Sequence, residues 1–268
     1  MSRTQSFLSV LAISSTVTLM ACASASTLPE VNGFGPSPHL PEPDKSLIPI
    51  VNVAKAVGWP DGAHPAPAAG TPVVPFAKGF AHPRWLHVLP NGDVLVAETN
   101  TPARPVQIGG IKGWFLKRYQ KKAGGAAPTA NRISLLRDAD GDGTAEIRTA
   151  FLTNLNSPFG MALVGNTLFI ANSDAVVKVS YSEGSTEIRE TPQQVAGLPV
   201  RKLDHHWTKS LIASVDGRKL YVALGSNSNV GENGMDNEAG RAAIWELEIA
   251  TGTHRMFATG LRNPVGMA

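Results

Sequence analysis

Three stretches of the chain share one pattern, and they read RWLHVLPNGDVLVAE at residues 84–98, FGMALVGNTLFIAN at 159–172 and KSLIASVDGRKLYVAL at 209–224. Each begins with an apolar run, turns through a short polar segment and continues with alternating apolar residues. The polar segments are Asn91-Gly92-Asp93, Gly165-Asn166-Thr167 and Asp216-Gly217-Arg218. Gly and Asn supply the positive φ angles that tight hairpins need, so each stretch predicts a β-hairpin.

A second hairpin is predicted after each of the three, at residues 132–151, 176–195 and 243–259. Four antiparallel strands that recur at intervals of about 40 to 75 residues are typical of propeller blades. We therefore expect an all-β fold, an incomplete β-propeller with about three blades and the first strand of a fourth. The loops between the two hairpins of each unit would leave from one face of the disc, where repeat proteins often bind ligands.

The composition excludes several other classes of protein. The chain has 268 residues, of which 43% are hydrophobic and 17% charged, with 26 Gly and 20 Pro. These values fit neither a disordered chain, nor a helical bundle, nor collagen. The formal net charge is only +3, so the sequence predicts no nucleic-acid partner.

The N-terminal residues 1–25 are typical of an export signal, with Arg3 before an apolar stretch too short to span a bilayer. The only cysteine, Cys22, follows Leu19-Met20-Ala21 as in a bacterial lipobox, whereas Ala23-Ser24-Ala25 offers an ordinary cleavage site. The mature protein would be either a lipoprotein anchored to the outer membrane at Cys22 or a soluble periplasmic protein. Residues 26–75 are rich in Pro, Gly and Ala and predict a tether, and residues 76–268 form the propeller domain.

The densest polar cluster is LDHHWTKSL at residues 203–211, where the innermost strand of the third unit begins. Adjacent residues of a strand face opposite ways, so only one of His205 and His206 can point into the central channel. Histidine is a suitable general base because its usual pKa lies close to neutral pH. The alternative is a pair of histidines with a purely structural role.

At this cluster and at GLRNPVG (260–266), the chain resembles the soluble quinoprotein sugar dehydrogenases. These are six-bladed propellers that use pyrroloquinoline quinone (PQQ). Within that family the chain is most similar to the L-sorbosone dehydrogenase branch, through PRWL (83–86), LPNGDVLVAETN (89–100) and GSNSNVGEN (225–233). The resemblance covers about residues 75–268.

The resemblance implies roles for several residues. His206 matches the base that takes the proton of the substrate hydroxyl as hydride passes to PQQ. Arg262 and Asn263 match a pair that holds PQQ, and a guanidinium suits its carboxylate and quinone oxygens; a simple turn that opens another blade is the alternative. His205 and Ser226 stand where glucose-type members carry aspartates, which weakens any transfer of glucose specificity.

Asp138, Asp140 and Asp142 lie at alternate positions with Gly143 at the sixth, as in the first half of a calcium loop. The twelfth position is Thr149, where a bidentate Glu would be needed, and the run falls on a predicted hairpin turn. A structural turn and a calcium site are both open. The resemblance places the catalytic calcium in a later blade, beyond residue 268.

The leading functional hypothesis is PQQ-dependent oxidation of a sugar aldehyde or an aldose, such as sorbosone or glucose. Electrons would pass to an external quinone or cytochrome, and the membrane would be reached only through Cys22. A propeller lactonase and a non-enzymatic ligand-binding propeller are the alternatives. A closed ring needs more residues than this chain offers, so we expect these residues to be the N-terminal part of a longer protein and to be inactive alone.

One insertion carries a further motif, KGWFLKRYQKK at residues 112–122, which predicts a short helix with basic and aromatic sides. It could rest on an anionic membrane, line the mouth of the site or pack its aromatic side on a blade edge.

Overall fold

The computed structural model describes residues 29–39, 53–102, 109–125, 127–201 and 204–268. The chain divides into two compact units, Met1–Ala54 and Lys55–Ala268. In the first unit the described residues contain one short 3-10 helix, η1 (Glu30–Gly33). The predicted export signal and Cys22 lie outside the described residues.

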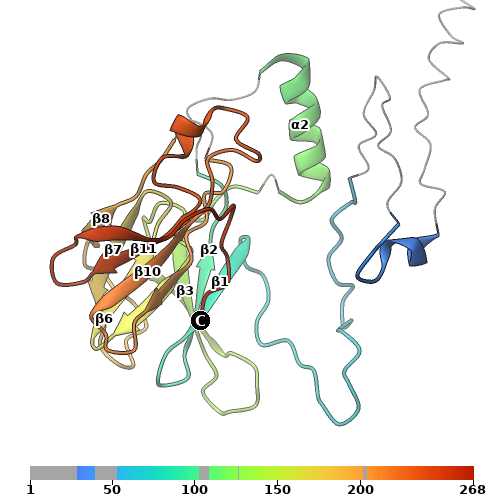
Figure 1. The fold of residues 1–268 in the computed structure, drawn as a ribbon. Coiled ribbons are helices and arrows are strands. Elements are labelled where there is room, and N and C mark those ends of the chain that lie inside the picture. Colours follow the sequence, from blue (N-terminus) through green and yellow to red (C-terminus); the bar gives the residue numbers. More distant parts are fainter. Residues whose placement is uncertain (1–28, 40–52, 103–108, 126, 202–203) are drawn as a thin grey trace, which may run out of the picture. The chain divides into compact units, whose positions relative to one another are not determined.

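The second unit contains three four-stranded antiparallel sheets (Figure 1). The first has β1 (Pro83–Val88), β2 (Val94–Glu98), β3 (Arg132–Arg137) and β4 (Ile147–Leu152). The second has β5 (Met161–Val164), β6 (Thr167–Ala171), β7 (Ala175–Ser180) and β8 (Gln193–Gly197). The third has β9 (Leu211–Ala213), β10 (Lys219–Leu224), β11 (Ala243–Glu248) and β12 (His254–Ala258). Strands within each sheet follow sequence order, which confirms the predicted hairpin pairs. The sheets do not close on one another, and the propeller stays a prediction.

The first hairpin of each sheet turns on glycine. Gly92, Gly165 and Gly217 have φ angles of 88°, 55° and 67°, in the left-handed region that glycine enters without steric cost. Asn91 has an ordinary backbone and instead donates its side-chain amide to Asp93 Oδ2 at 2.8 Å. The turns are therefore specified by glycine, with asparagine in a supporting role.

The second sheet is buried on both faces. Leu168 and Ile170 of β6 pack into a cluster shared with the first sheet. Phe169 and Ala171 point the opposite way, into a cluster shared with the third sheet. Neighbouring residues of a strand face opposite sides, so a strand with apolar residues at consecutive positions suits a place between two sheets. Burial of each large apolar side chain stabilises the fold by about 1.5–3 kcal/mol.

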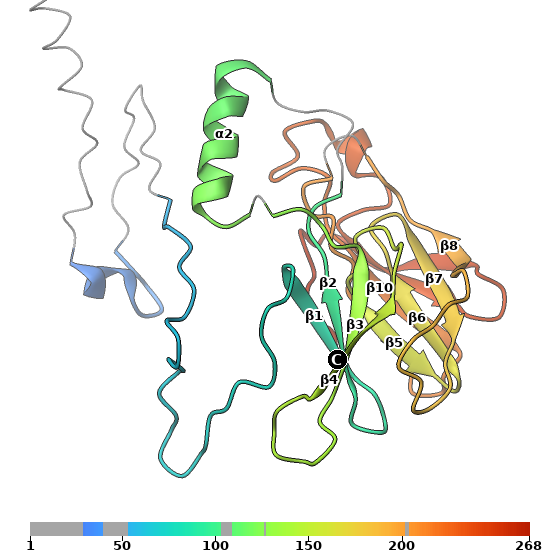
Figure 2. The same ribbon diagram turned by 180° about the vertical axis from the view of Figure 1, so that it is seen from behind.

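The insertion between β2 and β3 contains α2 (Gly110–Lys122), which confirms the predicted helix. In both views α2 lies apart from the strands (Figure 2). Trp114 is 59% exposed and Phe115 45% exposed, so the aromatic side is not packed on a sheet edge. The roles at a membrane or at the site mouth stay predictions. Among the described residues, no helix has the length and apolar character needed to cross a bilayer.

At Gly160 the backbone of the second sheet comes close to that of the third. Its N–H donates to the carbonyl of Lys209 at 3.0 Å, just before β9. A Cβ here would lie less than 3.0 Å from the backbone nitrogen of Leu211. We expect Gly160→Ala to lower the free energy of unfolding by about 3 kcal/mol, because the sheets must move apart. Urea denaturation measures this, with Gly58→Ala as control because a Cβ there meets nothing within 4 Å. Equal stability of the two variants would contradict the prediction.

Candidate functional site

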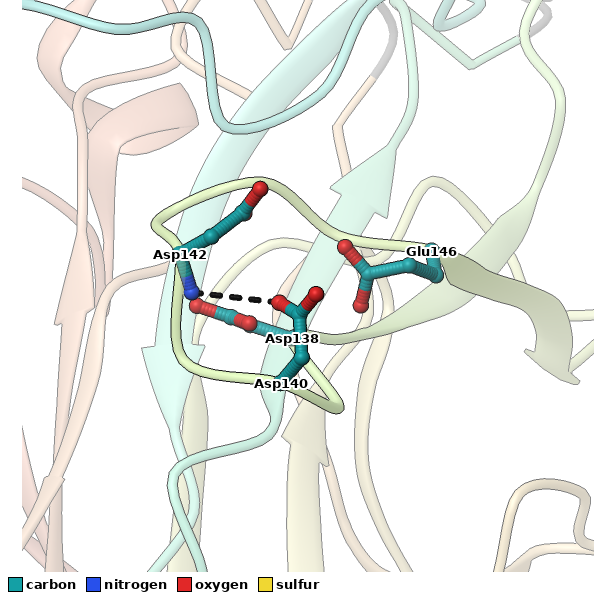
Figure 3. Close-up of side chains that lie close together, drawn as sticks. All are labelled: Asp138, Asp140, Asp142 and Glu146. Carbon is teal, nitrogen blue, oxygen red and sulfur yellow. Dashed lines mark hydrogen bonds between the residues drawn. The ribbon is translucent and has the colours of Figure 1, made fainter.

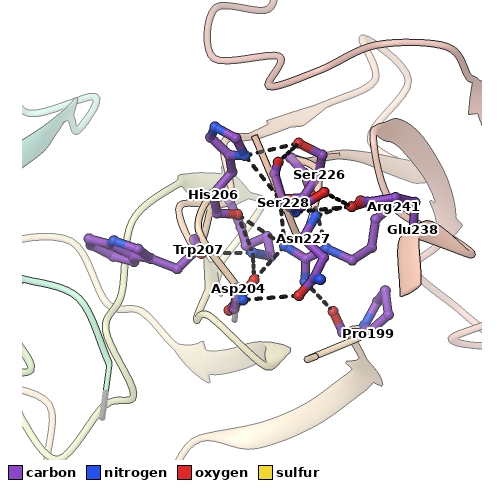
Figure 4. Close-up of polar contacts among 11 residues, drawn as sticks. Pro199, Asp204, His206, Trp207, Ser226, Asn227, Ser228, Glu238 and Arg241 are labelled. Atoms are coloured by element: carbon purple, nitrogen blue, oxygen red, sulfur yellow. Dashed lines mark hydrogen bonds and ion pairs between the residues drawn. The ribbon is translucent and has the colours of Figure 1, made fainter. Parts of the chain in front are cut away.

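Three segments that flank strands of the third sheet meet at the predicted site, and Figure 4 shows His206 bonded to Ser226 of the loop after β10. His206 lies just before β9, the loop that starts at Gly225 follows β10, and Asn263 follows β12. A Cβ on Gly225 would lie less than 3.0 Å from both His206 Cβ and Asn263 Oδ1. The absence of a side chain at Gly225 therefore allows His206 and Asn263 to approach the same backbone position. The structure brings these two predicted residues together.

The tautomer of His206 follows from its hydrogen bonds. Its Nδ1 lies 3.0 Å from the carbonyl oxygen of Ser226, which can only accept, so Nδ1 carries the proton. The Ser226 hydroxyl also lies 3.0 Å from Nδ1 and donates its own hydrogen to the carbonyl of Ser228 at 2.7 Å. In the neutral ring, Nε2 is then left as a free proton acceptor.

Electrostatics keep this ring neutral. Burial lowers the pKa of His206 below its usual 6.5, and the hydrogen bond to the Ser226 carbonyl opposes that change. The charges of Arg262, His205 and Arg241 lower the pKa of His206 further. An imidazole with a lowered pKa is unprotonated at neutral pH and can act as a general base.

Arg262 is exposed and reaches from the end of the third sheet to the loop after β10. Its Nε donates to the carbonyl of Asn229 at 2.8 Å, and its own carbonyl accepts from the N–H of Ser226 at 2.7 Å. The side-chain oxygen of Asn263 is buried and has no hydrogen-bond partner among the residues that the structure describes. A buried polar atom without a partner is costly, so this position is suited to a ligand that donates to it.

The two neighbouring histidines have different surroundings. His205 Nδ1 lies 3.9 Å from Glu232 Oε1, whereas His206 Nδ1 bonds to Ser226. The backbone N–H of His205 donates to the carbonyl of Asn227 at 3.0 Å. Only His206 is therefore held by the loop at Gly225 through its ring.

Sequence reasoning missed the charged residues that support these loops. Glu238 accepts from the backbone N–H groups of Asn227 at 2.6 Å and Ser228 at 3.0 Å. Arg241 is buried and donates to the carbonyl of Gly225 at 3.0 Å. Neither residue lies in a recognisable motif. The one available signal was Lys209, a cation just before the short apolar strand β9.

Lys209 has a fully buried side chain, and burial lowers the pKa of its ammonium group to about 8 although Asp204 opposes this. Between pH 8 and the usual 10.5, the folded protein has released this proton and the unfolded chain still binds it. The Lys209 contribution to the free energy of unfolding therefore rises with pH in that window. We expect the stability of the wild type relative to Lys209→Met to increase from pH 8 to 10 in urea denaturation. A constant difference would contradict this.

The acidic turn gathers Asp138, Asp140, Asp142 and Glu146, with one ligand atom of each within 4.8 Å of the others (Figure 3). Asp138 accepts from the N–H groups of Gly141 at 2.6 Å and Gly143 at 2.9 Å, which is the pattern of a structural turn. These bonds, led by that of Gly143, lower the pKa of Asp138.

A calcium loop that begins at Asp138 would need a glutamate at its twelfth position, which is Thr149 in this chain. Thr149 bonds through its hydroxyl to the carbonyl of Thr186, and Glu146 joins the aspartates instead. The turn is shown, and its use as a calcium site stays a prediction.

A protein-family model described as TrAA12-like matches residues 130–268, just over half of the chain. The chain belongs to the TrAA12-like family. The matched region of this TrAA12-like chain includes His206, Arg262 and Asn263. A search of the curated proteins finds no match.

Solved structures share the fold of this TrAA12-like chain. The holo form of the pyranose dehydrogenase PQQ domain from Coprinopsis cinerea is 16% identical with a TM-score of 0.53, covering 72% of this chain and 42% of that one. A calcium structure of a Trichoderma reesei enzyme of family AA12 is 18% identical with a TM-score of 0.52, covering 71% and 44%. The TrAA12-like chain thus spans less than half the length of either. The resemblance to PQQ-dependent sugar dehydrogenases agrees with these matches, and the sorbosone branch stays a prediction.

Proposed function

We propose that the protein carrying this chain is a PQQ-dependent oxidoreductase that removes hydride and a proton from a sugar. The observation that carries the proposal is the His206 ring, whose Nδ1 donates to the Ser226 carbonyl so that Nε2 is the proton acceptor, with His206 Cβ and Asn263 Oδ1 both close to Gly225. Family membership supports this proposal, as does the similarity in fold to a pyranose dehydrogenase PQQ domain.

His206 would act on the substrate hydroxyl. The oxidised carbon loses its hydrogen with the electron pair, and the hydroxyl loses a proton to Nε2 of His206. A neutral imidazole is required for this step, and its lowered pKa provides that form. The Ser226 carbonyl stabilises the imidazolium that results, because Nδ1–H keeps donating to it.

The residues near His206 fit the cofactor. PQQ carries three carboxylates, an ortho-quinone and a pyrrole N–H, and when bound it supplies the hydride acceptor. Arg262 is exposed, and its guanidinium, which bonds to Asn229 in the structure, can also bind carboxylate or quinone oxygens. Asn263 Oδ1 is buried without a partner and can accept from an N–H of a ligand. These two residues would hold the cofactor beside His206.

We propose a sugar aldehyde or an aldose as substrate and an external quinone or cytochrome as electron acceptor. His205 and Ser226 stand in place of the aspartates of glucose-type members, which weakens any transfer of glucose specificity to this protein. The complete fold would be a propeller with a catalytic calcium held outside these residues. Export to the periplasm, with or without a lipid anchor at Cys22, is part of the same proposal.

The test uses the intact gene product in its metal-free and cofactor-free form. Dye-linked oxidation of a panel of aldoses and sugar aldehydes should appear only when PQQ and calcium are both added, and PQQ absorbance should co-elute with the protein on gel filtration. Matched samples lack PQQ, lack calcium or contain heat-denatured protein. Lactone hydrolysis without PQQ, or no retention of PQQ, would overturn the proposal in favour of a lactonase or a non-enzymatic propeller.

A further inference from the structure

A cluster of three charged residues lies behind His206, away from solvent. The side chains of Lys209 and Arg241 are fully buried and that of Asp204 is 5% exposed. Arg241 Nη2 pairs with Asp204 Oδ1, and Lys209 Nζ lies 4.0 Å from the same oxygen. Two buried cations share one carboxylate. Their attraction to it therefore offsets only part of the free energy lost when the three charged groups leave water. Apolar residues often stabilise such positions equally well, so stability alone does not account for the arrangement.

Both cations donate to the carbonyl of His206 itself. Lys209 Nζ lies 3.3 Å from this oxygen and Arg241 Nη2 lies 3.2 Å from it. Lys209 also donates to the carbonyl of Trp207 at 2.7 Å. Hydrogen bonds from charged donors are stronger than neutral ones, and in a buried place they fix a backbone position firmly. Figure 4 shows the His206 ring and the Asp204 side chain on different sides of this segment.

Arg241 also ties the His206 segment to the loop that its ring contacts. Its Nε donates to the carbonyl of Gly225 at 3.0 Å, and its Nη2 lies 3.5 Å from the carbonyl of Ser226. The Ser226 carbonyl is the oxygen that accepts from Nδ1 of His206. One guanidinium thus holds the backbone of His206 and the acceptor that selects its tautomer.

The backbone of Asp204 is strained, which agrees with a cluster that holds the His206 segment in place. Asp204 has a φ of 44°, in the left-handed region that a non-glycine residue enters at a cost of about 1–3 kcal/mol. Its N–H donates to Asn227 Oδ1 at 3.0 Å and its carboxylate pairs with Arg241. The cluster holds the turn into the His206 segment in a conformation that the chain alone disfavours.

We propose that Arg241 and Lys209 are positioning residues that hold His206 in its base-competent orientation and tautomer. The expected effect on kcat rests on the proposed function, whereas the placement of His206 rests on the contacts of Arg241 and Lys209 in the structure. Arg241 acts through charge as well as geometry, since its guanidinium lowers the pKa of His206.

Other charged groups lie around this segment: Arg84 lies over the Trp207 ring at 5.6 Å, and the charge of Asp174 raises the pKa of Lys209. Arg262 and His205 also lower the pKa of His206, and Glu232 lies 3.9 Å from His205. Glu238 is occupied by the backbone of Asn227 and Ser228.

Arg241→Met and Arg241→Lys separate the effect of the positive charge of Arg241 from the effect of its hydrogen-bond geometry. Arg241→Met removes charge and hydrogen bonds, so we expect the pKa of His206 to rise and kcat for sugar oxidation to fall about 10- to 100-fold with a smaller change in KM. Arg241→Lys keeps the charge but loses the planar fork, so kcat falls about tenfold while the pKa of His206 stays near the wild-type value. The pKa is read by NMR of 13C-labelled histidine in the intact gene product without cofactor, with His206→Gln to assign the signal.

Arg137→Met is the matched control, because Arg137 pairs with buried Asp93 in the first sheet at 2.7 Å, remote from the His206 segment. It removes a comparable ion pair and should leave the His206 titration unchanged. If Arg241→Met and Arg241→Lys both behave like this control, the proposal is overturned; if Arg241→Met does not fold, Arg241→Lys decides alone through kcat. A raised pKa in Arg241→Met without sugar oxidation by the wild type would support the positioning role and refute the proposed function.

Discussion

His206→Gln lowers kcat for sugar oxidation by about 10²- to 10⁴-fold if His206 is the general base. Glutamine is similar in size and can still donate an N–H to the Ser226 carbonyl, which accepts from His206 in the structure. It has no nitrogen that takes a proton near neutral pH, so only the proton-transfer step is lost. The binding of PQQ and the KM for the sugar should change little.

The same role for His206 also predicts how the rate of sugar oxidation changes with pH. Imidazolium cannot accept a proton, so activity of the wild type falls as pH drops through the pKa of His206, which lies below 6.5. The acid limb of the kcat/KM profile should therefore lie below pH 6.5, and His206→Gln should lack that limb. His254→Gln, on exposed β12, is the control and should keep the wild-type profile. An unchanged kcat in His206→Gln would remove His206 from the mechanism.

Gly225→Ala has the second largest expected effect. A methyl group at this position would lie less than 3.0 Å from His206 Cβ and from Asn263 Oδ1, so one or both must move. A displacement near 1 Å in a catalytic arrangement can cost about 100-fold in rate, and we expect a loss of that size in kcat/KM. PQQ retention on gel filtration should weaken at the same time, because Asn263 is proposed to contact the cofactor.

Gly266→Ala controls for this variant, since its Cβ would meet nothing within 4 Å. Circular dichroism and urea denaturation should show that Gly225→Ala still folds. Sugar oxidation and PQQ retention within twofold of the wild type would contradict the close approach of His206 and Asn263 to Gly225.

The hairpins could be predicted because their signals are local. Gly92, Gly165 and Gly217 lie between alternating apolar runs, and the turn and the strand period depend on residues close in sequence. The exposed aromatic side of α2 could not be predicted, since exposure depends on which surfaces lie nearby in space.

The supporting residues of the site could not be predicted for a related reason. Arg241 bonds to the carbonyls of Pro199 and His206, which lie 42 and 35 residues away in sequence. No periodicity or spacing rule connects such positions. Glu146 in the acidic turn shows the same limit at short range, because counting along a calcium loop assumes a backbone path that this hairpin does not follow.

The placement of β6 between two apolar clusters bears on how the chain is assembled during synthesis. Every buried interface joins sheets that are consecutive in sequence, so the stability is close to a sum of nearest-neighbour terms. The first two sheets are complete once Gly197 has left the ribosome, and the cluster around Leu168 and Ile170 can form then. The third sheet, with His206 and Gly225, can then pack onto a preformed surface, so these two residues are placed on a part of the domain that is already ordered.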